Sequence, residues 1–291
     1  MKKVPRSLGV HDGSFHADEV TACALLLLYD LIDENKVIRT RDPEKLSTCD
    51  FVCDVGGVFD PEQRRFDHHQ VDYKGSLSSA GMVLAYLVKH KKMSEPLYTM
   101  LNETLIMGVD AHDNGVFHIV LGTTNFSQVI SNFLPVRYDS PPEAMDAAFM
   151  TAVRFARGHL ERLHERFAYT QECLEQVRQA MQNPEPILIF DESIPWIDNF
   201  FELGGATHPA QYVIMPSGDH WKLRGVPPTH AERMKIRRPL PLAWAGLHEA
   251  ELQAKTQIKG AIFCHKGRFI SIWKTKEDAL KAAHLALKEG R

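Results

Sequence analysis

The rest of the chain is organised around the stretch Arg65-Phe66-Asp67-His68-His69-Gln70. Two adjacent histidines follow an aspartate there, just beyond a short apolar run and a turn. Histidine is the commonest metal ligand, and its neutral ring nitrogen also suits proton transfer. A histidine pair without partners predicts little. Its meaning depends on which acidic and histidine residues the fold brings to the same place.

Short apolar strands and helices alternate on both sides of this stretch. We expect strands at 7–10, 37–41 and 50–55, a hairpin-like segment at 58–66, helices at 17–32, 78–90 and 95–109, and a mainly helical region at 145–182. The strand at 50–55 is apolar enough to be buried on both faces, as in a parallel sheet. This order predicts an α/β domain whose mainly parallel sheet is flanked by helices.

The pattern changes after Asn183-Pro184-Glu185-Pro186, where two prolines stop the preceding helix. Beyond them we expect strands at 187–190, 211–215, 222–226, 261–265 and 269–273, and helices at 247–254 and 276–288. These elements predict a smaller α+β domain. The expected domains are therefore residues 1–183 and 187–291, with a cleft between them.

Charge is distributed unevenly along the chain. Residues 1–219 carry 19 basic and 31 acidic side chains, whereas residues 220–291 carry 15 basic and 6 acidic ones. An acidic body with a basic end suggests that the first part holds a cation and the second receives an anion. The net charge of −3 is not basic enough to demand a long nucleic acid as partner.

The remaining composition predicts a cytoplasmic protein that does not enter a membrane. The five cysteines form no CxxC pair, which favours reduced thiols over a disulfide framework or a cysteine zinc site. Residues 1–7 are not followed by the apolar segment of a signal peptide. The longest apolar run, residues 22–29, is too short to span a bilayer.

Four groups of acidic and histidine residues stand where strands or helices end. They are His11, His16 and Asp18 after the first expected strand, Asp54 at the end of the third, Asp67, His68 and His69 after the hairpin, and Asp110 at the end of an apolar helix. In an open parallel sheet, ligands bind beyond the carboxyl ends of the strands. Nitrogen and oxygen donors without sulfur suit Mn²⁺, Co²⁺ or Mg²⁺. Their number fits two ions that share a carboxylate and act on a phosphoryl group.

These motifs resemble a known family. The chain is similar to the DHH phosphoesterase superfamily and, more closely, to the melanocyte proliferating gene family, once labelled metal-dependent protein hydrolases. The resemblance runs nearly the whole chain and rests on the segments 11–19, 54–60, 66–70, 78–81, 110–115, 240–247 and 260–265. Peptide hydrolysis has no separate support, because there is no HExxH motif and no clear nucleophile triad.

The resemblance implies a two-metal site, usually loaded with manganese. Its implied ligands are His11, His16, Asp18, Asp54 as the bridge, His68 and Asp110. His69 would face the phosphate, as a contact or an acid, with Asp67 orienting it. Many superfamily members carry aspartate where this chain has His16, so which ion His11 and His16 each bind stays open.

The C-terminal half lacks the glycine-rich signature of the commonest DHH-associated domain but fits the family's own pattern. It leaves Arg237, Arg238, His265, Lys266, Lys274 and Thr275 as candidates for binding an anionic substrate. Trp221, Trp244, Phe269 and Trp273 could stack on bases.

The expected function is a metal-dependent phosphodiesterase, first a 3′-to-5′ exonuclease on short single-stranded RNA, as the family resemblance implies. Two alternatives stay open at this point. The substrate could be a small nucleotide or phosphoanhydride, or the protein could be a metal-dependent binding or regulatory protein without turnover. The sequence also leaves open whether the chain forms a homo-oligomer.

Overall fold

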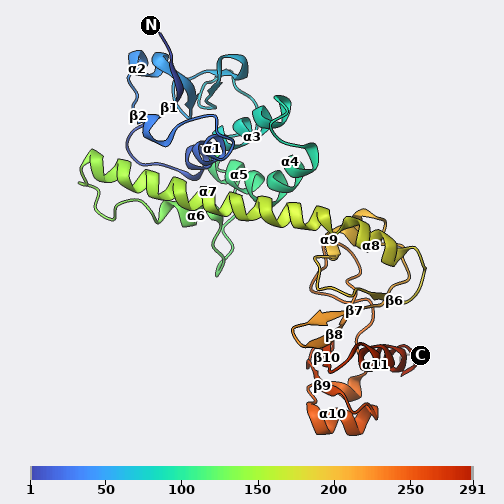
Figure 1. Cartoon of the computed structure of the whole chain (residues 1–291). Helices are drawn as coiled ribbons and strands as arrows, with labels where there is room; N and C mark the ends of the chain where they lie inside the picture. The colour runs from blue at the N-terminus through green and yellow to red at the C-terminus, as the bar shows by residue number, and fades with distance from the viewer. Residues whose placement is uncertain (1, 290–291) are drawn as a thin grey trace. The chain divides into compact units, whose positions relative to one another are not determined.

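The computed structural model describes residues 2–289, so the outermost residues of both expected domains lie outside it. The chain divides into two compact units, Met1–Phe167 and Ala168–Arg291. The division lies within helix α7 (Pro142–Glu172), ahead of the expected linker at 183–186. It does so because Cys173 and Val177 already pack into a core of the second unit. Figure 1 shows α7 as one long helix that passes from the first unit into the second.

The first unit is built on a five-stranded sheet in the order β2-β1-β3-β5-β4. Its strands are β1 (Val4–Val10), β2 (Val37–Arg39), β3 (Cys49–Cys53), β4 (Phe59–Asp60) and β5 (Arg65–Phe66). Strand β1 is parallel to β2 and β3, β3 is parallel to β5, and only β4 is antiparallel. The expectation of a mainly parallel sheet, and of an α/β class, is confirmed.

Helices pack on both faces of this sheet. They are α1 (Ala17–Leu28), α2 (Pro43–Thr48), α3 (Ser79–Lys89), α4 (Glu95–Leu101), α5 (Met107–Asp113), α6 (Phe126–Ser131) and the first part of α7, with short 3-10 turns at Glu34–Lys36 and Pro61–Gln63. Helix α1 is the central one, since every residue from Ala17 to Leu27 is buried. Phe51 and Phe66 from the sheet join it in the large core, while Leu46 of α2 and Val52 form a small core on the other face.

The second unit contains a mixed five-stranded sheet in the order β6-β7-β8-β10-β9. Its strands are β6 (Ile187–Ile189), β7 (Tyr212–Ser217), β8 (His220–Gly225), β9 (Ala261–Cys264) and β10 (Ile270–Trp273). Its helices are α8 (Leu174–Met181), α9 (Ile197–Glu202), α10 (Glu249–Thr256) and α11 (Lys276–Glu289), with a 3-10 turn at Leu242–Trp244. The expected α+β domain is present, and only β6 and β7 pair in parallel.

Three local features differ from the expected elements. The helix expected at 95–109 is three consecutive segments, because a π-helical stretch at Asn102–Ile106 separates α4 from α5. The helical structure also continues to Asp113 instead of ending before Asp110. Helices α2, α6 and α9 were not expected, since each has only six residues and too little periodicity to detect. Within residues 2–289, no helix has the length and apolarity needed to cross a membrane.

The buried position of α1 gives a stability prediction. Leu25→Ala should lower the free energy of unfolding by about 2–5 kcal/mol, because the truncated side chain leaves a cavity in a closed core. Urea denaturation followed by far-UV circular dichroism measures this change. Leu121→Ala is the matched control, since Leu121 is 93% exposed and its loss should change stability by less than about 0.5 kcal/mol. Equal effects of the two substitutions would contradict the central placement of α1.

Candidate metal centre

The candidate site lies in the first unit, where parallel strands end. His11 directly follows β1, Asp54 directly follows β3, and His68 follows β5 by one residue. Because β1, β3 and β5 are adjacent in the sheet and run in the same direction, their carboxyl ends meet at one edge. The first turn of α1, which carries Asp18 and Glu19, begins at this edge.

The His11 ring is held in a fixed orientation by contacts at both of its ring nitrogens. Its Nδ1 lies 2.9 Å from the carbonyl oxygen of Asp12. Its Nε2 lies 2.9 Å from a carboxylate oxygen of Glu19 and 3.1 Å from Oδ2 of Asp54. Burial opposes protonation of His11, but the hydrogen bonds with Asp54 and Glu19 outweigh it and raise the pKa of His11 to about 10. A ring whose Nδ1 bonds to a backbone carbonyl presents Nε2 as a metal ligand.

Asp54 lies between His11 and His68 and contacts both. Burial works against its ionisation, yet hydrogen bonds with His11 and His68 lower the pKa of Asp54 to about 2. Its backbone has a φ of +57°, a left-handed conformation that costs a non-glycine residue free energy and is found where a side chain must be aimed. Its Oδ1 lies 3.3 Å from Nε2 of His68, while its Oδ2 faces His11.

His68 lies among three carboxylates. Its Nε2 is 3.0 Å from Oδ2 of Asp113, 3.3 Å from Oδ1 of Asp54 and 3.9 Å from Oδ2 of Asp18. The hydrogen bonds with Asp113 and Asp54 raise the pKa of His68 to about 10. The ring is therefore positioned where several negative charges converge.

Asp18 is a buried carboxylate at the centre of the candidate site. Its side chain is fully buried, and neither carboxylate oxygen has a hydrogen-bond partner among the described residues. Burial, followed by the charges of Glu19 and Asp54, raises the pKa of Asp18 far above its usual range. Burying a carboxylate costs free energy unless it is paired with a counter-charge or coordinates a metal. The donor set around Asp18 therefore fits a divalent cation.

Three overlapping groups of side chains could hold metal ions. They are His11, His16, Glu19 and Asp54; Asp54, His68 and His69; and His16, Asp18 and Asp113. Asp54 and His16 each belong to two groups, so a shared carboxylate between two centres is geometrically available. All donors are imidazole nitrogens or carboxylate oxygens, as Mn²⁺ and Mg²⁺ sites use.

Asp110 does not join these groups. Its Oδ1 accepts hydrogen bonds from the backbone N–H groups of Ser78 and Gly81 and from the Ser78 hydroxyl, at 2.6–3.1 Å. Asp110 thus caps the N-terminus of α3, and burial raises its pKa despite these bonds. Asp113, one helical turn further on α5, is the carboxylate that reaches His68. The structure therefore favours Asp113 over the predicted Asp110.

His69 and Asp67 are arranged differently from His68. The His69 side chain is 62% exposed, and its Nδ1 lies 2.8 Å from Oδ1 of Asp67. Asp67 is buried and is itself held by the N–H of Gly57, 2.6 Å from its Oδ2. Asp67 therefore fixes the orientation of the His69 ring at the edge of the site.

Comparison with known proteins identifies the family to which the chain belongs. Residues 7–287 match the family model MYG1_exonuc, described as "Uncharacterised protein family (UPF0160)". The chain belongs to the MYG1 family. The MYG1 protein of Chlamydia trachomatis serovar D is 50% identical over 289 residues, which cover 99% of each chain. The MYG1 exonuclease of Homo sapiens is 31% identical over 325 residues, covering 97% of this chain and 86% of the human one. The family resemblance predicted from the motifs is confirmed.

A likeness to a solved structure is more distant. The crystal structure of RecJ in complex with Mn²⁺ from Thermus thermophilus has 14% sequence identity and a TM-score of 0.27, with coverage of 97% of this chain and 52% of that chain. This chain thus matches only about half the length of that protein. A likeness at this level does not decide the fold or the site of a MYG1 protein.

In this MYG1 chain, the six predicted anion-binding residues do not converge. His265 and Lys266 lie in the turn that joins β9 to β10. Lys274 lies at the opposite end of that hairpin, where its N–H bonds to the carbonyl of Gly260, and Thr275 caps the start of α11. These two pairs therefore cannot contact one phosphate group together.

Arg237 has a structural role instead of the predicted substrate contact. Its guanidinium donates to the backbone carbonyls of Gly205, Ala206, His208, Ala210 and Pro227 at 2.6–3.5 Å. These five bonds use all five N–H donors of the guanidinium, so no donor is left for an anion. Arg238 donates to the carbonyl of Leu287, 2.8 Å away. Trp244 and Trp273 are buried against each other, with ring centroids 5.9 Å apart, and cannot stack on bases.

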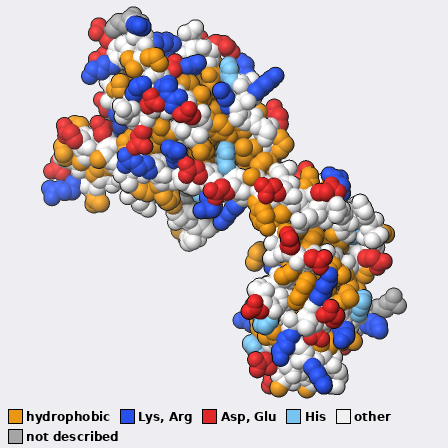
Figure 2. Space-filling model, in the orientation of Figure 1, with side chains coloured by type: hydrophobic (Ala, Val, Ile, Leu, Met, Phe, Trp, Pro, Cys, Tyr) orange, Lys and Arg blue, Asp and Glu red, His pale blue; other side chains and the backbone are white. Residues whose placement is uncertain are grey.

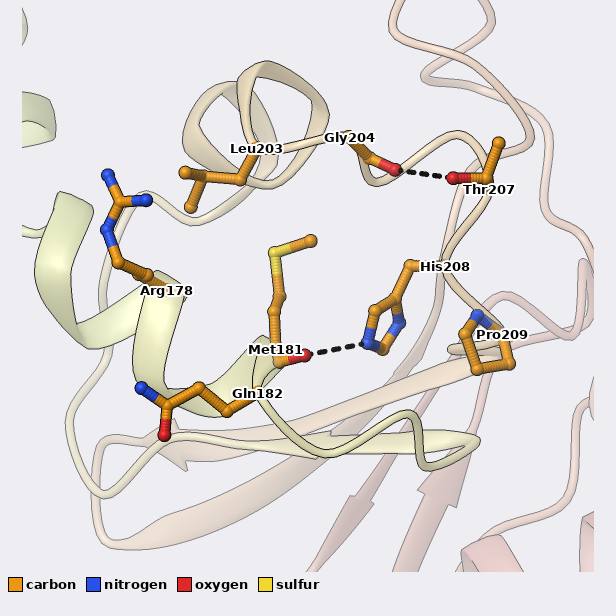
Figure 3. A pocket seen from close by; sticks show the side chains of 8 residues that line it. All are labelled: Arg178, Met181, Gln182, Leu203, Gly204, Thr207, His208 and Pro209. Carbon is orange, nitrogen blue, oxygen red and sulfur yellow. Dashed lines mark hydrogen bonds between the residues drawn. The ribbon is translucent and has the colours of Figure 1, made fainter.

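A pocket in the second unit is separate from these residues. Figure 3 shows its lining, Arg178, Met181, Gln182, Leu203, Gly204, Thr207, His208 and Pro209. Its polar groups satisfy one another, since Thr207 donates to the Gly204 carbonyl and the His208 ring faces the Met181 carbonyl. Arg178 pairs with Glu175. None of the predicted site residues lines this pocket, and its chemistry points to no ligand.

Two residues of the site were missing from the sequence-based set. Glu19 is next to the predicted Asp18 but was not in that set, yet it is fully buried and faces His11. A second acid beside Asp18 in a helix with no other charged residue was the signal for it. Asp113 shares its helix with Asp110, and only the continuation of α5 past Asp110 distinguishes their directions.

Replacing Asp18 tests the need for a cation. Asp18→Asn should stabilise the metal-free protein by about 1–3 kcal/mol, because it removes a buried ionisable group that has no hydrogen-bond partner among the described residues. It should also reduce the rise in melting temperature that Mn²⁺ causes in the wild type. Differential scanning fluorimetry at pH 7, after dialysis against EDTA and with or without MnCl₂, measures both effects.

The matched control for this experiment is Asp50→Asn. Asp50 accepts a hydrogen bond from Arg64 at 2.7 Å and lies outside the three metal-binding groups. Its replacement should lower stability and leave the Mn²⁺ effect unchanged. A metal-free Asp18→Asn protein that is less stable than the wild type, or one that keeps the full Mn²⁺ response, would show that Asp18 needs no cation.

Two further variants distinguish Asp110 from Asp113. Asp113→Asn should weaken Mn²⁺ binding by about tenfold or more, because it removes the carboxylate beside His68. Asp110→Asn should leave Mn²⁺ affinity within about threefold, since the amide oxygen still accepts the bonds from Ser78 and Gly81. Isothermal titration calorimetry measures both affinities. The reverse order would restore Asp110 as the ligand.

Proposed function

We propose that this MYG1-family protein is a metal-dependent hydrolase of phosphodiester bonds, an exonuclease that degrades short single-stranded RNA in the 3′-to-5′ direction. The observation that carries the proposal is Asp18, a fully buried carboxylate that has no hydrogen-bond partner among the described residues and lies beside Asp54 and His68. That arrangement calls for cations at a sheet edge where substrates bind. A human relative named MYG1 exonuclease supports the choice of reaction.

The proposed cofactor is a pair of divalent ions, with Mn²⁺ first and Mg²⁺ or Co²⁺ as alternatives. His11, His16, Asp18, Asp54 and His68 would hold them, joined by Glu19 and by Asp113 in place of Asp110. Such ions, when bound, neutralise phosphate charge and lower the pKa of water. The protein's contribution is to fix the donors, and the backbone of Asp54 in its left-handed conformation does this for the shared carboxylate.

His69 is the proposed partner of the phosphate. Its Nδ1 is occupied by Asp67, so its Nε2 is the nitrogen left to face a substrate. From that nitrogen His69 can hydrogen-bond a phosphate oxygen and give a proton to the leaving oxygen. Its exposed ring has room to approach a substrate, whereas the His68 ring is enclosed.

A labelled oligonucleotide tests the activity and its direction. With Mn²⁺, a short single-stranded RNA labelled at its 5′ end should give progressively shorter labelled products. Asp54→Asn should abolish this degradation, and His69→Gln should lower the rate by roughly 10²–10⁴-fold while Mn²⁺ affinity is kept. Denaturing gel electrophoresis measures the products and the rates.

The control variant is His284→Gln, which replaces an exposed histidine on α11 and should keep the wild-type rate. Immediate release of a labelled mononucleotide would reverse the proposed direction. Cleavage of nucleotides or pyrophosphate without any shortening of RNA would identify a small-metabolite phosphohydrolase instead. The absence of turnover on all of these substrates with Mn²⁺, Mg²⁺ and Co²⁺ would leave a binding protein.

A further inference from the structure

The sheet of the second unit has one face that is only half covered by helices. On one side, Trp273, Cys264 and Leu223 pack into the core formed with α10 and α11. On the other side, Val213 and Met215 of β7 pack into the core formed with α8 and α9. The remaining part of this second side, made by β8, β10 and β9, contributes no residue to either core. Figure 1 shows α10 and α11 beside these strands.

The side chains of this uncovered part are known from the strand register. Lys222 and Arg224 alternate on β8, and they pair across the ladder with Ile272 and Ile270 of β10. Ile272 in turn pairs with Phe263 of β9. Because paired residues point to the same side of a sheet, these five side chains share one face. All five are partly exposed, and we call them the open face.

The open face carries positive charge that has no acidic partner. Within residues 2–289, neither Lys222 nor Arg224 forms a salt bridge, and the Lys222 amine reaches only the Ser193 hydroxyl, at 3.3 Å. Burial, and then the charge of Arg224, lowers the pKa of Lys222, and burial lowers the pKa of Arg224. Two adjacent, partly buried cations favour an anion above them. On the face of the second unit that Figure 2 shows, Lys and Arg side chains are interspersed with acidic ones.

A row of rings continues from the open face toward the sheet edge. The His248 and Phe263 ring centroids are 4.9 Å apart, those of Phe263 and His265 are 6.2 Å apart, and those of His265 and Phe269 are 4.5 Å apart. His248 bridges to Phe263 in antiparallel fashion, which places both on the same side. Phe269 is 38% exposed. Exposed rings beside cations are the combination that binds bases and phosphates of a single strand.

We propose that the open face, together with His248, His265 and Phe269, binds single-stranded nucleic acid, with phosphates on Lys222 and Arg224 and bases against the rings. The row of four rings is longer than one base, so it fits a strand better than a mononucleotide. This inference rests on the proposed function, because it assigns the surface of the second unit that would hold the exonuclease's substrate. It replaces the buried Trp244 and Trp273 as stacking residues.

Binding without turnover tests this inference. The full-length protein in EDTA is titrated into fluorescein-labelled oligo(U), and fluorescence anisotropy gives the Kd at several salt concentrations. The double variant K222Q/R224Q should bind roughly tenfold more weakly, and the slope of log Kd against log salt should fall by about 1.4, since each lost phosphate contact removes about 0.7 for a single strand. Phe263→Leu should weaken binding at least about fivefold with little change in that slope.

The matched control is K281Q/K288Q, which removes the same charge from exposed positions on α11. It should keep the wild-type slope and a Kd within about twofold, and circular dichroism checks that each variant is folded. Equal effects of the two double variants would overturn the inference, because charge alone would then explain the binding. If that happens while wild-type protein still shortens labelled RNA, the proposed function stands and only the surface is wrong. A selective loss in K222Q/R224Q by a protein that shortens no RNA would keep the surface and reject the exonuclease.

Discussion

The first unit depends on one constraint: carboxylates are buried together at the edge of a parallel sheet without enough partners of their own. Asp18 is fully buried without a hydrogen-bond partner among the described residues, and Asp54 is also buried, although a buried carboxylate normally requires a counter-charge. Among the described residues, the basic side chains that face these two carboxylates are the histidines His11, His68 and His69. Burying these carboxylates costs free energy, and a bound cation would offset that cost. The first turn of α1 and the neighbouring strand ends are therefore suited to bind cations.

Several local features serve this constraint. Asp54 adopts a left-handed backbone conformation, and Gly56 and Gly57 follow it with φ values of +98° and +66°, which lets the chain turn sharply beneath the site. The π-helical stretch at Asn102–Ile106 precedes the turn of α5 that carries Asp110 and Asp113. One of these two acids caps α3 and the other faces His68, so a single helical turn serves both stability and the site.

The second unit differs from the first, because its mixed sheet packs against two cores of unequal extent, one on each side. The side toward α10 and α11 is closed, whereas the opposite side is closed only over β6 and β7. Arg237 stabilises the closed part by joining backbone carbonyls of the 205–210 segment and Pro227. On the uncovered part, Lys222 and Arg224 form no salt bridge with any residue in 2–289. Positive charge in this unit thus both supports the backbone, at Arg237, and lies on the uncovered part of the sheet.

The sequence by itself determined the alternation of strands and helices, the parallel first sheet, the family and the clusters around His11, Asp54 and His68. These follow from local patterns, because strand ends and the residues just after them can be recognised without knowing the fold. The sequence could not determine that Glu19 and Asp113 face the site or that Asp110 caps α3. It also could not determine that Arg237 donates its hydrogen bonds to backbone carbonyls. Those roles depend on which side of a helix or sheet a residue occupies after packing. Only the tertiary structure fixes that side, because a one-residue change in helix end or strand register redirects the side chain.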